Sequence, residues 1–258
     1  MQKAMEQNEI FSRNNGLIST EEQAMLWNTC VLIAGTGGDG GLLAERLART
    51  GIGHLILADP EVFEAANINR QYAANELTTG VNKAVAVARQ LALINPEMKL
   101  TVCPAGIDKE NVRALVEAAD LIVDEIEYTA PAISVLLHRT ARKQNKYVFM
   151  GANIGWGASI FCFAPAGKTF EQHFSYNGSD GTIDVPAYYK MRPSYITDDL
   201  AEAVLDGSIT MPSVAASVCL TAAVLTSEII WFVTGKKRPV IVPEFISIDL
   251  FDLTISIN

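Results

Sequence analysis

A glycine-rich turn followed by an acid is the clearest sign of chemistry in this 258-residue chain. Gly35, Gly37, Gly38 and Gly40 form the stretch GTGGDG, which lies between an apolar run and a helix-forming segment. Glycines let the backbone pass close to phosphates, and the amides at a helix start attract their charge. A second apolar run closes on Asp59, where a carboxylate can accept hydrogen bonds from a ribose hydroxyl. This spacing predicts a site for a dinucleotide or for ATP.

Two cations that follow the acid favour ATP over a nicotinamide cofactor. Arg70 and Lys83 come shortly after Asp59, on a loop and at a helix start that can return over the phosphates. A triphosphate must have its charge neutralised before a carboxylate attacks the α-phosphorus, whereas amides and the helix dipole suffice for the pyrophosphate of NAD. The alternative is that both are solvated surface charges.

The elements that must position these residues alternate between strand and helix. Strands are expected at 29–34, 54–58, 100–103, 121–124 and 147–150, with helices at 38–49, 81–94, 109–118 and 131–143. This alternation predicts an α/β protein with a Rossmann-like, doubly wound, mostly parallel sheet. In such sheets ligands bind outside the carboxyl ends of the strands, where the strand order reverses.

The C-terminal half of the chain breaks this alternation. The stretches 154–163 and 240–257 are expected to be strands without crossover helices, added antiparallel to the sheet, and the polar loop segment 164–212 lies between them. Long irregular segments tend to be lids or binding loops. We expect one domain, 1–258, with an N-terminal arm and helix at 1–30, a nucleotide-binding core at 31–150 and a sheet extension at 151–258.

Composition and sequence motifs indicate which partners, metals and cellular compartments to expect. The formal net charge is −9, and phosphate backbones are held by clustered Lys and Arg, so nucleic acid is not an expected partner. No CxxC pair is present, and no zinc is expected. The apolar stretch 214–233 carries Ser, Thr and Glu, which favours a buried helix over a membrane span. Without a secretion signal, a cytoplasmic protein is expected.

The combined pattern resembles the ubiquitin-activating-enzyme superfamily, the group that contains ThiF, MoeB and HesA. The resemblance covers roughly residues 10–165 and is specific over 35–95, with GxGGxG, an acid eleven residues before Arg-Gln, and a Lys after Gly80. Members adenylate the C-terminal carboxylate of a ubiquitin-like or sulfur-carrier protein with magnesium ATP. The resemblance therefore implies an adenylyltransferase that uses ATP and Mg²⁺ and releases pyrophosphate.

Residue roles follow from the same resemblance. The glycines would hold phosphates and Asp59 the ribose, while Asn67, Arg70 and Lys83 would contact the phosphates; Gln71 follows the arginine as in the family. Arg13, in Phe-Ser-Arg-Asn, resembles an N-terminal arginine that reaches the phosphates of the other subunit, which implies a homodimer. The catalytic candidates implied in this way include Arg13, Arg70 and Lys83.

Two departures from the family pattern concern metal and sulfur chemistry. After the strand at 121–124 the family reads Asp-Cys-Thr-Asp-Asn, whose second aspartate binds magnesium, whereas this chain reads Asp-Glu-Ile-Glu-Tyr. Glu127 keeps a carboxylate there and is the expected magnesium ligand and fourth catalytic candidate. Residues 164–218 contain no cysteine, and Cys162 and Cys219 lie in apolar segments, where we expect them to be buried and inert. No thioester step is expected.

Three other functions stay open on the sequence alone. The altered segment 125–128 and the missing loop cysteine also suit a non-catalytic relative that acts as a dimeric protein-binding module. An NAD-dependent oxidoreductase would need only the glycine turn and Asp59. Within the superfamily, the stretch from Arg49 to Gly53 resembles dehydratases that activate a carboxylate on a tRNA nucleoside, although the acidic charge weighs against that substrate.

Overall fold

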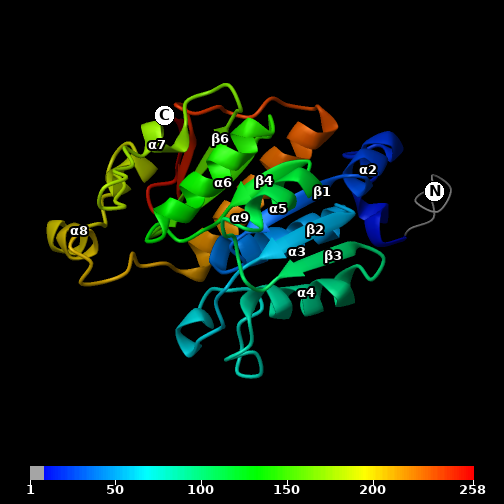
Figure 1. The fold of residues 1–258 in the computed structure, drawn as a ribbon, viewed down its shortest axis with the longest axis horizontal. Helices are drawn as coiled ribbons and strands as arrows, with labels where there is room; N and C mark the ends of the chain where they lie inside the picture. Colours follow the sequence, from blue (N-terminus) through cyan, green and yellow to red (C-terminus); the bar gives the residue numbers. More distant parts are fainter. Residues whose placement is uncertain (1–8) are drawn as a thin grey trace.

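The central feature of the computed structural model, which describes residues 9–258, is one sheet of eight strands in the order β3-β2-β1-β4-β5-β6-β7-β8 (Figure 1). The parallel strands are β1 (Cys30–Ala34), β2 (His54–Ala58), β3 (Lys99–Cys103), β4 (Leu121–Asp124) and β5 (Val148–Ile154). The antiparallel strands are β6 (Gly157–Phe163), β7 (Ile246–Asp249) and β8 (Thr254–Ile257). The predicted sheet, mostly parallel with antiparallel strands at its C-terminal end, is confirmed.

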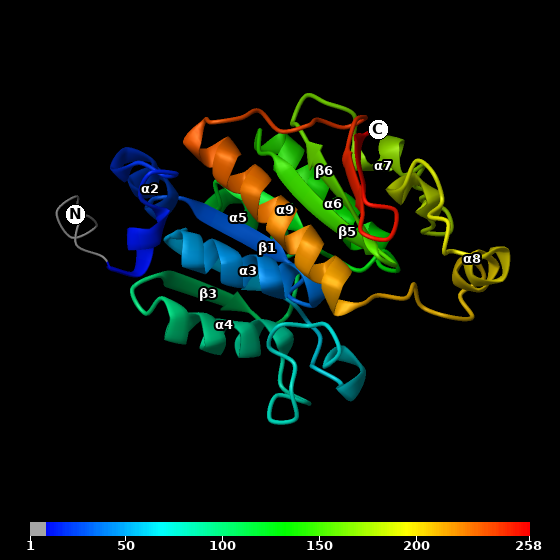
Figure 2. The ribbon, with the colours of Figure 1, turned by 180° about the vertical axis from the view of Figure 1, so that it is seen from behind.

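Helices cover both faces of this sheet. On the face shown toward the viewer in Figure 2 lie α3 (Gly38–Thr50), α4 (Lys83–Ile94) and α9 (Ala215–Thr234). On the opposite face, in front in Figure 1, lie α5 (Val112–Ala118) and α6 (Pro131–Lys143). α2 (Thr20–Trp27) leads into β1 and follows the 3₁₀ turn η1 (Glu9–Asn14). The arrangement is doubly wound, as the alternation of strands and helices predicts.

The sheet divides the apolar core into two layers. Within β1, Val31 and Ile33 belong to the layer under α3, α4 and α9, whereas Leu32 and Ala34 belong to the layer under α5 and α6. Successive strand side chains point to opposite faces, so a strand covered on both sides is apolar throughout. This explains why the strand that leads into the glycine turn reads as an uninterrupted apolar run.

Local capping signals set several helix boundaries. Ser19 and Glu22 form a capping box at the start of α2, in which Ser19 N donates to Glu22 Oε2 at 2.7 Å. Asn82 caps α4 by accepting a hydrogen bond from Val85 N at 3.1 Å, so that helix begins at Lys83, two residues after the predicted start at 81. The cap thereby places Lys83 in the first turn of α4.

The polar segment 164–212 contains short helices that the sequence analysis did not predict. They are α7 (Phe170–His173), the 3₁₀ turn η3 (Val185–Tyr188) and α8 (Asp198–Leu205), and α8 lies at the periphery of the molecule in Figure 1. Thr169 and Thr197 cap α7 and α8, and the apolar side chains of α7 and η3 join the core layer of α5 and α6. Non-local packing therefore orders much of this segment.

Among the described residues, α9 is the helix long and apolar enough to cross a membrane by length and composition alone. It packs against α3, β5 and β6, and half of its most apolar stretch is buried. Cys162 in β6 is buried, as expected, and burial raises the pKa of its thiol. Cys219 on α9 is exposed, so the expectation that it is buried is wrong: its face of the helix points away from the sheet.

His173 is expected to make folding stability depend on pH. Phe161 and Phe174 pack on its ring, and both ring nitrogens are buried without a hydrogen-bond partner among the described residues. Burial lowers the pKa of His173 to about 4. The unfolded chain takes up this proton near pH 6.5, so His173 by itself should lower the free energy of unfolding by about 2 kcal/mol between pH 7 and pH 5.

Urea unfolding at the two pH values measures this loss. His173→Phe removes the titrating ring and fits the aromatic surroundings, so its free energy of unfolding should rise by about 2 kcal/mol relative to that of the wild type over the same interval. An equal pH dependence in the variant and the wild type would show that His173 is not the source.

Candidate nucleotide site

A cavity of about 280 Å³ lies at the carboxyl ends of the parallel strands. Its walls come from the glycine turn, the ends of β2, β4 and β5, the start of α4 and parts of the segment 185–213. The chain runs outward from β1 through β2 to β3 and then returns to β4 on the other side of β1. The cavity therefore lies at the reversal of strand order, where the fold class predicts a ligand.

The glycine turn is held tightly between β1 and β2. Gly35 leaves β1 with φ +94°, and its N donates to Ala58 O at 2.8 Å. Gly40 packs so closely on the turn that a Cβ there would lie 2.0 Å from Gly35 O. Gly35, Gly37 and Gly38 line the cavity, whereas Gly40 is not among its lining residues. The start of α3 thus presents backbone to the cavity, and Gly40 makes the packing of that turn possible.

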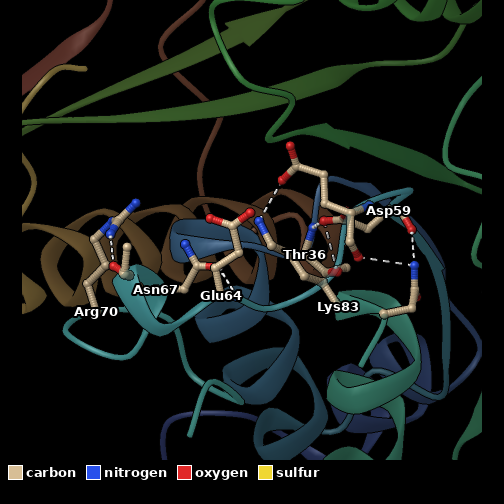
Figure 3. Close-up of polar contacts among 9 residues, drawn as sticks. Thr36, Asp59, Glu64, Asn67, Arg70 and Lys83 are labelled. Carbon is tan, nitrogen blue, oxygen red and sulfur yellow. Dashed lines mark hydrogen bonds and ion pairs between the residues drawn. The ribbon is translucent and has the colours of Figure 1, made fainter. Parts of the chain in front are cut away.

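Asp59 lies beneath this turn and is 4% exposed. Thr36 N donates to its Oδ2 at 2.6 Å, and Glu61 N donates to its Oδ1 at 2.9 Å (Figure 3). Burial raises the pKa of Asp59, and these hydrogen bonds oppose the rise. A carboxylate offers about four lone-pair sites, so Asp59 retains capacity for a further donor such as a ribose hydroxyl.

The two predicted cations both line the cavity but have different surroundings. Lys83 is 5% exposed, and its Nζ lies 2.6 Å from Glu61 Oε2. Arg70 is half-buried on the loop after Asp59, where its Nη1 donates to Ala66 O at 3.1 Å and to Asn69 Oδ1 at 2.9 Å. Figure 3 shows Lys83 beside Asp59 and Arg70 farther along the loop. Lys83 is thus paired already, whereas the hydrogen-bond partners of Arg70 among residues 9–258 are neutral.

The remaining predicted residues lie at different distances from the cavity. Gln71 is 5% exposed and lines the cavity, and its Oε1 is buried without a partner among the described residues. Asn67 ends the 3₁₀ turn η2 (Ala65–Asn67), where its Oδ1 accepts a hydrogen bond from Glu64 N at 2.9 Å, and it does not line the cavity. Arg13 is exposed on η1, which contacts α3, and it lies outside the cavity lining. Phosphate contacts by Asn67 and Arg13 stay predictions.

Glu127, the predicted magnesium ligand, is an exposed residue in the cavity wall. Loss of water from its surroundings raises the pKa of its carboxyl, the Glu61 carboxylate adds to the rise, and Lys83 and Arg70 oppose it. Glu125 also lines the cavity, and its Oε1 accepts a hydrogen bond from Gly151 N at 2.9 Å. Burial raises the pKa of Glu125 well above its ordinary value.

One wall residue was missed by the sequence analysis, although it stands inside the glycine motif. Asp39 occupies the first turn of α3 between two glycines and is 7% exposed. Asn153, at the end of β5, donates from Nδ2 to Asp39 Oδ2 at 2.7 Å. The aspartate within GTGGDG could have indicated this residue, but its hydrogen-bond partner Asn153 lies 114 residues away in the chain.

Apolar and aromatic side chains form another part of the cavity lining. Its members come from the chain after β3, from the β4 to α6 connection and from the segment 185–213: Ile107, Ile126, Ala130, Ile133, Val185, Tyr188, Tyr189 and Met211. A lining that combines carboxylates, cations and backbone amides with apolar and aromatic groups fits a ligand with a charged part and a flat apolar part. A nucleotide has this division.

Comparisons with known proteins agree with this reading of the fold. Adenylyltransferase and sulfurtransferase UBA4 of Candida albicans is 25% identical over 217 residues, which are 84% of this chain and 44% of the relative. The tRNA threonylcarbamoyladenosine dehydratase of Bacillus subtilis is 39% identical over 160 residues, 62% of this chain and 63% of the relative. The chain spans less than two thirds of the length of either relative.

Solved structures and a family model extend the match to nearly the whole chain. The crystal structure of E. coli MccB with ATP has the same fold, with a TM-score of 0.73 and 20% identity, and the match covers 98% of this chain and 72% of that chain. The model of the ThiF family matches residues 11–257. The family resemblance that begins with the glycine turn is confirmed, and the chain belongs to the ThiF family.

Proposed function

We propose that this chain is an ATP-dependent adenylyltransferase that activates a carboxylate, at the C-terminus of a ubiquitin-like or sulfur-carrier protein or peptide, as an acyl-adenylate. One observation carries the proposal: the glycine turn, Asp59, Arg70 and Lys83 line the same cavity at the strand-order reversal. Relatives named adenylyltransferases support ATP-dependent adenylation in general, and MccB has been solved with ATP. The identity of the carboxylate is part of the proposal.

The charged and polar residues of the cavity have distinct tasks in this reaction. The amides at the start of α3 bind phosphate oxygens, and Asp59 orients the ribose. A carboxylate oxygen of the partner attacks the α-phosphorus, and the bond from that phosphorus to the bridging oxygen breaks as pyrophosphate leaves with the electron pair. Arg70 and Lys83 offset the negative charge that this displacement concentrates on the phosphates.

The residues also fit the magnesium ion that the family resemblance implies. Glu127 presents an exposed carboxylate to the cavity, and the neighbouring Glu61 carboxylate contributes, after desolvation, to the raised pKa of its carboxyl. Carboxylates are the protein ligands that Mg²⁺ prefers beside phosphate oxygens. When bound, the ion would offset phosphate charge, and Glu127 is the proposed protein ligand.

A homodimer forms part of the proposal. Arg13 is exposed and outside the cavity lining of its own chain. For Arg13 to reach phosphates, as the resemblance implies, a second copy must bring it to the cavity mouth. Light scattering would measure the oligomeric state directly.

Exchange of labelled pyrophosphate into ATP tests the proposed reaction. The purified chain is mixed with magnesium ATP and with peptides ending in Gly-Gly, and exchange is expected only when a suitable carboxylate is present. A tRNA fraction provides a second carboxylate source, because the dehydratase of Bacillus subtilis is also similar to this chain.

Calorimetry with ATP and with NAD separates the alternative functions. Preference for ATP excludes the oxidoreductase, and ATP binding without any exchange favours the non-catalytic module. Absence of ATP binding would overturn the proposal.

A further inference from the structure

Asp39 puts a buried carboxylate at the point of the fold where phosphates are expected to bind. It belongs to the first turn of α3, lines the cavity and is 93% buried, since 7% of it is exposed. Its Oδ2 accepts a hydrogen bond from Asn153 Nδ2, whereas its Oδ1 is buried without a hydrogen-bond partner among residues 9–258. A buried carboxylate oxygen without a partner is costly and calls for an explanation.

The orientation of Asp39 is set by a chain of side-chain contacts. The Ser213 hydroxyl donates to Asn153 Oδ1, so the amide nitrogen of Asn153 faces Asp39. Asn153 is one of the last two residues of β5, and Ser213 precedes α9, so two separate segments of the chain hold the carboxylate in place. Asn153 is a positioning residue: it occupies one oxygen of Asp39 and leaves the other available.

The charges around Asp39 are unfavourable for a bare nucleotide. Carboxylates from Asp39, Asp59, Glu61, Glu125 and Glu127 line the cavity, against the two cations of Arg70 and Lys83. Lys83 already pairs with Glu61. Burial raises the pKa of Asp39 to about 7, and the Glu127 carboxylate adds to the rise. A triphosphate placed here would add further negative charge beside these acidic side chains, and a divalent cation would offset it.

A cation that arrives with the nucleotide fits the donor set. Among residues 9–258, no three His, Cys, Asp or Glu side chains are placed together to hold a metal ion. Mg²⁺ is usually bound by one or two carboxylates together with substrate phosphates and water, so a complete protein cage is not required. A single carboxylate at the glycine turn, beside the expected phosphates, is sufficient for that kind of site.

We infer that Asp39 is a ligand, through its unpartnered Oδ1, to a divalent cation that joins the glycine turn to the nucleotide phosphates. This inference rests on the proposed ATP site and adds a residue that the family pattern does not supply. Under this inference the cation raises nucleotide affinity by binding to Asp39 as well as to Glu127. Asp39 does not favour metal-free nucleotide, because its acidic side chain then faces the phosphates without a cation between them.

The test compares nucleotide affinity with and without Mg²⁺ by calorimetry, using AMPCPP so that no turnover occurs. Asp39→Asn keeps the size and shape of the side chain. The factor by which Mg²⁺ raises AMPCPP affinity should be at least about 10-fold smaller in this variant than in the wild type. Without Mg²⁺ the variant should bind AMPCPP at least as tightly as the wild type. Asp199→Asn, on the exposed surface of α8, should retain the full gain.

A second measurement uses Mn²⁺ alone, with free Mn²⁺ followed by electron paramagnetic resonance. Wild-type protein should bind Mn²⁺ about 10-fold more tightly than Asp39→Asn, and Asn153→Ala should fall between them. Thermal unfolding shows that each variant is folded. If Asp39→Asn retains both the Mg²⁺-dependent gain and the Mn²⁺ affinity, the inference is wrong. If no variant binds AMPCPP, the proposed ATP site fails, and the Mn²⁺ comparison alone decides the role of Asp39.

Discussion

Replacing Arg70 with alanine should lower the rate of ATP–pyrophosphate exchange by about 100-fold or more. Arg70 lines the cavity, and its described hydrogen bonds go to two neutral oxygens, Ala66 O and Asn69 Oδ1. Within the described part of the chain its positive charge has no ion-pair partner, in contrast to that of Lys83, whose Nζ lies 2.6 Å from Glu61 Oε2. An unpaired cation in an acidic cavity is the group best placed to stabilise charge on the leaving pyrophosphate.

Arg89→Ala is the matched control for this experiment. Arg89 is an exposed arginine on α4, outside the cavity lining, so its removal changes the net charge equally without changing the site. Adenosine affinity should be unchanged in Arg70→Ala, because adenosine carries no phosphate, whereas affinity for magnesium ATP should fall. Exchange that persists at the wild-type rate in Arg70→Ala would place the phosphate site elsewhere.

The part of the fold that the sequence predicts best is the unit from β1 to β2. Its apolar runs, its glycines and its helix-forming stretch are all local signals, and β2 (His54–Ala58) has the predicted boundaries. α5 begins at Val112 and not at 109, because Asp108 Oδ1 accepts hydrogen bonds from Glu110 N and Asn111 N and holds those residues in a turn. Competition between side-chain capping and helix extension sets such boundaries.

Features that depend on contacts distant in sequence were not predictable. The short helices α7 and α8 have local threonine caps, but α7 is ordered by Phe170 and Phe174, which pack against Phe161 and Phe163 of β6. The exposure of Cys219 depends on which face of α9 meets the sheet. A nearly all-apolar helix has little periodicity from which that face can be chosen.

The candidate site shows the same division between local and distant information. Asp59, Arg70 and Lys83 are recognisable because their spacing follows one strand-turn-helix unit, and all three line the cavity. The pairing of Lys83 with Glu61 and of Asp39 with Asn153 arises from side-chain geometry that spacing alone does not determine. These pairings decide which cation is unpaired and which acid lacks a partner, so they carry the more specific chemistry.

Gly35→Ala should destabilise the fold by about 3 kcal/mol or more and remove nucleotide binding. Gly35 has φ +94°, a left-handed conformation that costs an alanine about 1–2 kcal/mol. A Cβ at this position would also lie 2.1 Å from Glu125 O, and that oxygen belongs to the backbone that leaves β4. The backbone at 125 is tied to β1 by a hydrogen bond from Glu125 N to Ala34 O at 2.7 Å, so it cannot move without separating the two strands.

Gly80→Ala separates the two contributions to this loss. Gly80 has a similar φ of +82°, but a Cβ there has nothing within 4 Å. It should therefore show the conformational cost alone, about 1–2 kcal/mol, with ATP affinity unchanged. Urea unfolding gives the free energy of unfolding for both variants, and the difference between them measures the close approach of β1 and β4 at the glycine turn. If Gly35→Ala and Gly80→Ala lost the same free energy of unfolding, the backbone after β4 would have to move aside for the added Cβ. The close contact between Gly35 and Glu125 would then not hold the glycine turn in place.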